Sequence, residues 1–153
     1  AGLDDAGRAH LRRTALGVIF QQFNLIPSLT VAENIAFQAR RSGRWDGAYC
    51  TELCATLGLT DHVAKYPEAL SGGQQQRVAV ARAIVSDPKM LLCDEPTGDL
   101  DRTTADEILT MLQELNRDYG KTIVMVTHDP EAAKYATKTV HLDKGEFVEK
   151  DAA

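Results

Sequence analysis

The sequence predicts an α/β protein in which a helical subdomain interrupts the core sheet. Short apolar runs that predict buried strands alternate with helical segments near both ends of the chain, whereas residues 30–86 are mainly helical in pattern. The length of 153 residues and the hydrophobic content of 44% allow a sizeable core. We therefore assign residues 1–29 and 87–153 to the core and residues 30–86 to the subdomain.

The first third of the chain contains one strand followed by helices. A short helix is expected within residues 1–13, and the apolar run at 16–20 predicts a strand that ends at Gln21. Thr30 and Glu33 have the spacing of a capping box, which begins a helix to about residue 41. The next expected elements are an apolar loop at 23–29, a break at 43–47, a helix from about Ala48 to Leu57 and one further turn capped by Thr60 or Asp61.

The stretch Leu70–Arg77 is LSGGQQQR, and it begins the most informative helix. Ser71 and Gln74 form a second capping box, and the apolar positions that follow continue the helix until shortly before Pro88. Two glycines at the helix start let backbone N–H groups approach a ligand, because no Cβ intervenes. The unpaired N–H groups and the helix dipole favour an anion such as phosphate.

A second buried strand is predicted directly before the acidic pair Asp94–Glu95, within the stretch MLLCDEPT. Asp101 can then cap a long helix that Gly120 ends. The apolar stripe expected on this helix consists of Ala105, Ile108, Leu109, Leu112, Leu115 and Tyr119.

The last third predicts a third strand, a short helix and a hairpin. Residues 122–127 are β-branched and apolar, which is typical of a parallel strand buried on both faces. Asp129 followed by Pro130 is an N-cap with proline at the first helical position, and this helix is expected to reach about Tyr135. The hairpin is expected to pair residues 139–142 with residues 146–149.

Composition excludes several classes of function. A net charge of −5 argues against a nucleic-acid partner bound through bulk positive charge, and we expect none. No apolar run has the length of a membrane span, and no signal peptide is visible. The cysteines are odd in number and lack CxxC spacing, which indicates a reducing cytoplasm. Cys50 and Cys54 share a helix face, and we expect packing there and not a metal site.

LSGGQQQR, a helix and then LLCDEPTGDLD at residues 91–101 resemble the nucleotide-binding subunits of ABC transporters. The sequences of these motifs are most similar to those of the lipoprotein-release and macrolide-export types. LSGGQ matches the family's signature loop and LLCDE its Walker B strand, and the resemblance covers nearly the whole chain. It implies the P-loop NTPase fold, ATP and Mg²⁺ as ligands, and two ATP molecules sandwiched in a head-to-tail dimer.

The resemblance also implies catalytic roles at the strand ends. Glu95 would be the general base that deprotonates the attacking water, and Asp94 would hold Mg²⁺ through a water. His128 would contact the γ-phosphate. Gln21 would report on Mg²⁺ and the attacking water, with the adjacent Gln22 as the alternative. Without the family, an acidic pair, a histidine and a glutamine at strand ends have ordinary structural explanations.

In the family, the signature loop binds the γ-phosphate of a nucleotide held by the other subunit, and the D-loop, here Gly98–Asp101, links the two sites. Asp101 also fits the simpler role of an N-cap. The nucleotide-binding residues implied in this way are Ser71, Gly72, Gly73, Gln74, Asp99 and Asp101.

A transmembrane permease is the second implied partner, and it would place the protein on the cytoplasmic face of a membrane. Residues 23–29 and the helices after Thr30 would form the groove that receives the permease. Core packing explains the apolar side chains of residues 23–29 equally well.

The phosphate-binding motif GxxxxGKS/T, called Walker A, does not occur in these 153 residues. The chain therefore resembles the C-terminal part of a longer domain, with an incomplete core sheet. We expect that it alone neither binds ATP tightly nor hydrolyses it, and that its unpaired strand edges favour association. The alternatives are a non-catalytic module that donates LSGGQ to a complete partner, and a soluble ABC ATPase of translation or DNA repair.

Overall fold

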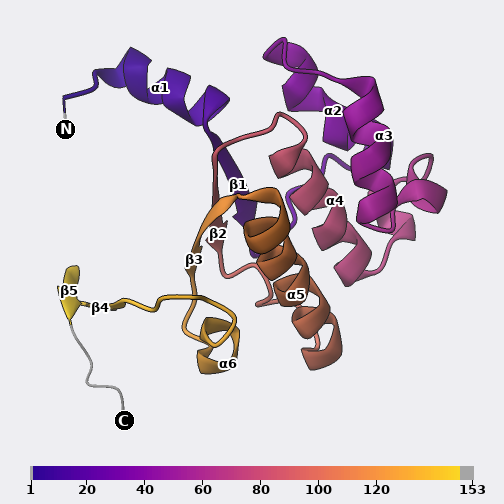
Figure 1. The fold of residues 1–153 in the computed structure, drawn as a ribbon. Coiled ribbons are helices and arrows are strands. Elements are labelled where there is room, and N and C mark those ends of the chain that lie inside the picture. Colours follow the sequence, from indigo (N-terminus) through magenta and orange to yellow (C-terminus); the bar gives the residue numbers. More distant parts are fainter. Residues whose placement is uncertain (1, 149–153) are drawn as a thin grey trace.

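The computed structural model describes residues 2–148, apart from the side chains of residues 12–14. The described chain contains both helices and strands, and short turns of 3-10 helix lie at Thr60–His62 and Pro67–Ala69 (Figure 1). The elements are α1 (Asp5–Thr14), β1 (Leu16–Phe20), α2 (Val31–Arg41), α3 (Gly47–Thr56), α4 (Gly72–Ile84), β2 (Met90–Asp94), α5 (Arg102–Tyr119), β3 (Thr122–Val126), α6 (Pro130–Ala133), β4 (His141–Asp143) and β5 (Glu146–Val148).

The helix starts follow the capping patterns in the sequence. Thr30 and Ser71 each form a complete capping box, with Glu33 and Gln74 respectively, and Asp101 caps α5. Each box pairs two N–H groups that a helix start would otherwise leave without an acceptor. The predictions of these three starts are confirmed. The predicted helix at 48–57 is α3, one residue earlier at each end.

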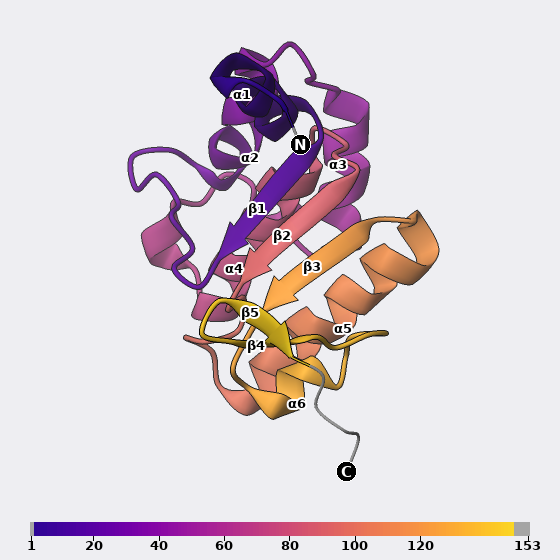
Figure 2. The same cartoon turned by 90° about the vertical axis from the view of Figure 1, so that its left-hand side faces the viewer.

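The core is a parallel sheet in the order β1-β2-β3, with all three carboxyl ends at one edge (Figure 2). Helices α4 and α5 cover one face of this sheet. Helix α4 approaches β1 so closely that a Cβ at Gly17 would lie 2.5 Å from the carbonyl oxygen of Ala83. Glycine is therefore required in β1 for this packing.

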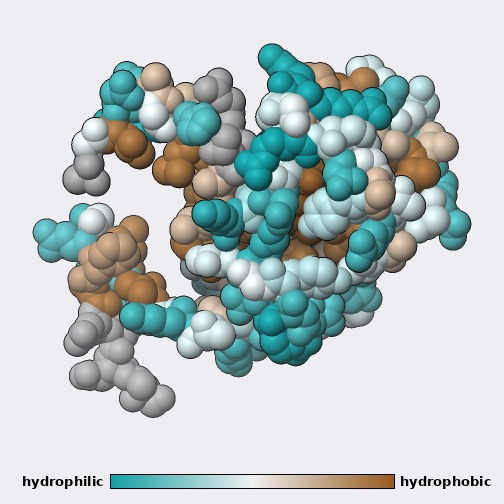
Figure 3. All heavy atoms as spheres, turned by 45° about the horizontal axis from the view of Figure 1, so that its top comes forward, coloured by the Kyte–Doolittle hydropathy of each residue, from teal (hydrophilic) through white to brown (hydrophobic). Residues whose placement is uncertain are grey.

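The opposite face of the sheet is open, so the prediction that β3 is buried on both faces is wrong. Val124 and Val126 of β3 are 44% and 53% exposed, and Phe20 and Met90 on the neighbouring strands share this face. Helix α1 and the β4–β5 hairpin lie beyond this face, and Figure 3 shows hydrophobic side chains on both sides of the hollow between them. The β-branched pattern reports strand propensity, whereas burial depends on what packs above the strand.

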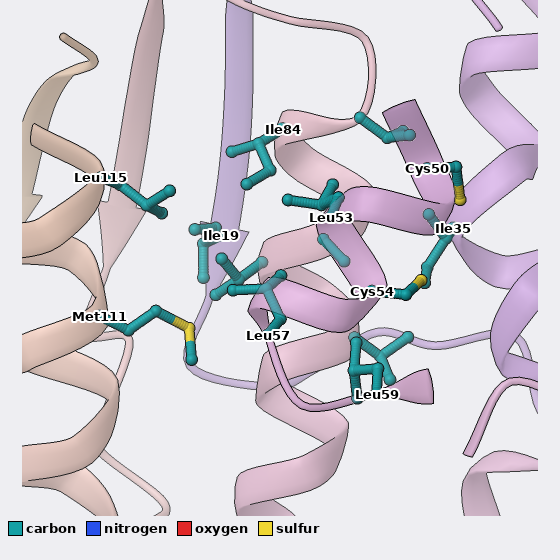
Figure 4. Close-up of a cluster of buried hydrophobic side chains, with 14 of the residues drawn as sticks. Ile19, Ile35, Cys50, Leu53, Cys54, Leu57, Leu59, Ile84, Met111 and Leu115 are labelled. Carbon is teal, nitrogen blue, oxygen red and sulfur yellow. The ribbon is translucent and has the colours of Figure 1, made fainter. Parts of the chain in front are cut away.

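A single cluster of buried side chains runs from α2 and α3 through α4 to the sheet and α5 (Figure 4). Cys50, Cys54 and Cys93 are buried in it as free thiols, and the packing predicted for Cys50 and Cys54 is confirmed. The predicted apolar stripe of α5 is also buried, apart from Tyr119, which is 52% exposed. Met111 is buried as well, although it is not in the predicted stripe. The division into core and subdomain stays a prediction.

The C-terminal hairpin forms a sheet of its own, in which β4 pairs with β5 and neither strand pairs with β3. The hairpin prediction is confirmed with β4 shifted, since β4 is His141–Asp143 where residues 139–142 are predicted. Strand β5 begins at Glu146 as predicted, and Glu149 lies outside the described residues. Within residues 2–148, β3 is thus an edge strand. The expected association through free strand edges stays a prediction.

Candidate functional site

Parallel pairing brings together residues that are far apart in the chain. Phe20, Asp94 and Val126 are partners across β1, β2 and β3. The residues that directly follow these strands therefore meet at one edge of the sheet. This edge carries Gln21, Glu95 and the segment Thr127–His128, which include all three residues predicted to be catalytic.

Glu95 is bound by the end of the neighbouring strand. Its Oε1 accepts a hydrogen bond from the backbone N–H of His128 at 2.9 Å and lies 2.8 Å from Nδ1 of the same residue. Its Oε2 accepts a hydrogen bond from the Thr127 hydroxyl at 3.0 Å. The Glu95 side chain is 13% exposed, whereas that of His128 is 93% exposed. The carboxylate is thus fixed inside the edge while the imidazole projects from it.

The backbone of Glu95 has a positive φ of 48°, which is uncommon for a residue other than glycine. Two hydrogen bonds hold it: the Glu95 N–H donates to the Val126 carbonyl at 2.8 Å, and the Gly98 N–H donates to the Glu95 carbonyl at 3.0 Å. Such backbone conformations concentrate at functional sites, where the surrounding contacts maintain them.

Gln21 contacts the loop that follows Glu95. Its Nε2 donates to a carboxylate oxygen of Asp99 at 3.0 Å, and a Cβ at Gly98 would lie 2.7 Å from the Gln21 side chain. Glycine at residue 98 therefore leaves the space that this glutamine occupies. The structure in this way joins Gln21 to the predicted D-loop.

The other carboxylates at this edge differ in their surroundings. Asp94 is exposed, on the open face of the sheet. Asp101 accepts a hydrogen bond from the Thr104 N–H at 2.8 Å as the N-cap of α5. This hydrogen bond lowers the pKa of Asp101, because it stabilises the ionised carboxylate.

Oxygen ligands for Mg²⁺ are available at the edge. Among residues 2–148, no group of three or more His, Cys, Asp or Glu side chains is arranged to hold a metal ion. Mg²⁺ commonly uses only one or two protein ligands and keeps waters or substrate oxygens for the rest. The Asp94 carboxylate and the Gln21 amide oxygen fit that requirement, since the Gln21 nitrogen is already bound to Asp99.

The signature loop begins α4 at the same end of the molecule. Ser71 is exposed, and a Cβ at Gly72 would lie 3.4 Å from Leu100 of the predicted D-loop. No hydrogen bond or ion pair that the structure describes joins residues 71–74 to Glu95 or His128. Among the described residues, the two parts of the predicted site are therefore not joined by a direct polar contact within one chain.

Gly73 has a packing role that the sequence analysis missed. It is buried, and a Cβ at this residue would lie 2.4 Å from Cγ2 of Thr104 on α5. From the sequence alone, both glycines are explained by the approach of a ligand. At Gly73 the structure shows a neighbouring helix in the place that a side chain would occupy.

We expect Gly73→Ala to destabilise the fold by about 1–3 kcal/mol through this overlap, lowering the Tm by several degrees. Thr104→Ser removes Cγ2 and should restore most of the loss in the double variant. Gly47→Ala is the matched control, because a Cβ there meets only ordinary contacts and alanine is the better helix former. Thermal unfolding followed by circular dichroism measures all four. An unchanged Tm for Gly73→Ala would contradict the packing role.

Two further residues of this region have no motif that predicts them. Thr127 binds Glu95, and the buried Gln76 of α4 binds two backbone carbonyls at the strand ends. The sequence indicates their role only through their position next to predicted site residues.

Between residues 2 and 148 the structure contains no helix with the length and hydrophobicity that a membrane span requires.

Comparison with known protein families gives a consistent result. A family model described as ABC transporter matches residues 3–98. YvrO of Bacillus subtilis, an uncharacterized ABC transporter ATP-binding protein, is 44% identical over 149 residues, which are 94% of this chain and 64% of YvrO. The methionine import ATP-binding protein MetN of Caulobacter vibrioides is 46% identical, covering 99% of this chain and 47% of MetN. The macrolide export ATP-binding/permease protein MacB of Syntrophobacter fumaroxidans is 41% identical, covering 90% of this chain and 20% of MacB.

Solved structures agree. A dimeric structure of MJ0796, a bacterial ABC transporter cassette, superposes with a TM-score of 0.81 at 40% identity, covering 96% of this chain and 66% of that one. A dimeric post-hydrolysis state of MJ0796 bound to ADP and Pi superposes with a TM-score of 0.80 at 39% identity. The chain spans less than two thirds of the length of YvrO and about half that of MetN.

Proposed function

The chain belongs to the ABC transporter family, with the α/β fold of its ATP-binding cassettes, and on that premise we propose that it is part of an ATP-hydrolysing subunit that powers transport across a membrane. Supporting relatives include an importer subunit and an exporter protein. We therefore propose ATP hydrolysis that powers transport, without a direction of transport. The partners would be a second ATP-binding subunit and a transmembrane permease, with this subunit peripheral on the cytoplasmic face.

The observation that carries the proposal is the contact of Glu95 with the segment Thr127–His128. Two hydrogen bonds, from a hydroxyl and a backbone N–H, hold the carboxylate at the sheet edge in a single orientation. A general base needs this positioning, because it must accept a proton from a water in a defined place. We assign that role to Glu95, with His128 beside it on the exposed side to contact the γ-phosphate.

ATP would be the substrate and Mg²⁺ the metal ion. Mg²⁺ supplies charge neutralisation for the phosphate oxygens when it is bound. Asp94 and Gln21 would hold it, since they offer the oxygen ligands at this edge. The Gln21–Asp99 hydrogen bond orients the amide, so that its oxygen is the atom left for the cation.

The phosphate of the partner's nucleotide would bind the signature loop. Ser71 is exposed there, and helix geometry leaves the N–H groups of Gly72 and Gly73 without intrahelical acceptors. Because no described hydrogen bond or ion pair joins the loop to Glu95 within one chain, a complete site would combine Glu95 of one subunit with Ser71 of the other. Asp99 and Asp101 would line the connection between the two sites. The MJ0796 structures are dimeric, which supports a second subunit as the partner.

Mixing two defective subunits tests the composite site. In the full-length gene product we expect Ser71→Arg and Glu95→Gln each to abolish most ATP hydrolysis, because each damages both sites of a homodimer. A mixed dimer retains one site with an intact Ser71 and an intact Glu95, so hydrolysis should return when the two variants are combined. Phosphate release measures it. No recovery in mixed dimers isolated with two affinity tags would contradict the head-to-tail arrangement.

A second function is consistent with the exposed position of Ser71 at the start of α4. The chain would then donate its signature loop to a complete subunit without binding nucleotide itself. Addition of the chain should raise hydrolysis by a subunit with an intact phosphate-binding loop, and the Ser71→Arg chain should not. Equal activity with both chains would exclude this function.

A further inference from the structure

Gln76 lies two residues beyond the signature loop and is completely buried, with 0% exposure. Its Nε2 donates a hydrogen bond to the carbonyl of Phe20 at 3.2 Å and another to the carbonyl of Pro96. Its Oε1 is buried and has no hydrogen-bond partner among the described residues. A buried amide with an unpaired acceptor is costly. The two donated bonds are therefore the feature that distinguishes this side chain from an apolar one of the same size.

The chemistry of the amide allows only one orientation. A primary amide has two N–H donors on nitrogen and only acceptor capacity on oxygen. Both neighbours of Nε2 are carbonyl oxygens, so the reversed amide would place an acceptor against two acceptors. Gln76 therefore ties two backbone segments to α4 with both of its donors.

These two segments carry the proposed catalytic residues. Phe20 directly precedes Gln21, and Pro96 directly follows Glu95. A second side chain of α4 binds the loop that follows β1. Arg82 donates hydrogen bonds to the carbonyls of Phe23 and Asn24 at 2.9 and 2.7 Å. Burial lowers the pKa of Arg82.

The geometry points to Gln76 as a positioning residue that sets the distance between Gln21 and Glu95 and ties both to the signature helix. This inference rests on the proposed ATP hydrolysis at that edge. Ser71 is the N-cap of α4, so the same helix that presents the loop to one nucleotide holds the hydrolytic residues for the other. Gln76 joins these two parts directly, through one side chain and without a ligand.

The kinetic test compares Gln76→Met with a matched variant in the full-length gene product. Methionine has a similar volume and length but no donor, so a residue that serves only packing would tolerate it. Lys121→Met is the control. Lys121 is also buried, and its Nζ binds Asp87 and, at 2.9 Å, the carbonyl of Pro88, but it lies at the opposite edge of the sheet.

We expect Gln76→Met to lower kcat by up to about 10²-fold, the loss that a displacement of roughly 1 Å causes at a reacting centre. KM for ATP should change little, and the Mg²⁺ concentration for half-maximal rate should rise, because Gln21 moves relative to Asp94. Lys121→Met should lower the Tm and leave kcat and the Mg²⁺ dependence unchanged. Equal kcat values for Gln76→Met and Lys121→Met would overturn the inference.

Amide hydrogen exchange on the 153-residue chain tests the positioning without ATP. The Glu95 N–H is bonded to the Val126 carbonyl of β3, and the N–H groups of Gly98 and Leu100 are bonded to the carbonyls of Glu95 and Thr97. Exchange of all three should accelerate about tenfold or more in Gln76→Met, as loss of one hydrogen bond of about 1.4 kcal/mol implies. The N–H of Val31, bonded to the Lys65 carbonyl, should be unaffected. Unchanged exchange at all three loop amides would refute the positioning role. Absence of ATP hydrolysis in the native full-length protein, with accelerated exchange in the variant, would refute only the proposed function.

Discussion

Replacing Glu95 with glutamine is expected to reduce ATP hydrolysis by the full-length protein about 10²–10⁴-fold, the usual contribution of a general base. Glutamine keeps the shape of the side chain. Its oxygen can still accept from the His128 N–H, and its nitrogen can donate to the Thr127 hydroxyl oxygen, so the contacts at the sheet edge persist. Only the capacity to take a proton from water is lost, because an amide is not a base at neutral pH.

In this variant, steady-state phosphate release should therefore fall while equilibrium nucleotide binding persists. We expect binding of ATP to remain within a small factor of the native value while kcat falls. Glu52→Gln on the exposed surface of α3 makes the same chemical change away from the site and should leave both unchanged. Retention of the native kcat in Glu95→Gln would show that Glu95 is not the base.

Weak binding of ATP by the isolated 153 residues is the second large effect expected. A phosphate-binding loop supplies several backbone N–H groups and one lysine to the β- and γ-phosphates. Each charge-assisted hydrogen bond contributes about 1.5–3 kcal/mol, so three of them amount to at least about 4.5 kcal/mol. Every 1.4 kcal/mol is tenfold in affinity, and the chain should therefore bind ATP about a thousandfold more weakly than a cassette that contains this loop.

Isothermal titration of the chain with ATP and Mg²⁺ measures this affinity, and a cassette that contains a phosphate-binding loop is the reference. The Ser71→Arg chain is the control, because the predicted role of Ser71 is toward the nucleotide of another subunit. It should bind ATP no more weakly than the native chain. A micromolar dissociation constant for the isolated chain would show that the residues described here form a nucleotide site on their own.

Much of the local structure follows from short stretches of sequence. The two capping boxes, the N-cap at Asp101 and the left-handed glycine at residue 120 end or begin helices as predicted, because each depends on groups within a few residues. The strand at 16–20 is confirmed at its predicted bounds. The contact of Glu95 with His128 was anticipated only through the family resemblance, since no local rule places residues 33 positions apart side by side.

The sequence by itself determined the order of elements, the parallel strands and the set of polar residues at their ends, because periodicity and capping are local properties of the chain. Only the tertiary structure decided that Gly73 accommodates Thr104, that one face of the sheet stays open, and that the Gln76 amide ties Phe20 to Pro96. The physical reason is the same in each case. Burial, steric overlap and the pairing of a buried donor depend on atoms brought from distant parts of the chain, and a side chain's own residue type does not specify its neighbours.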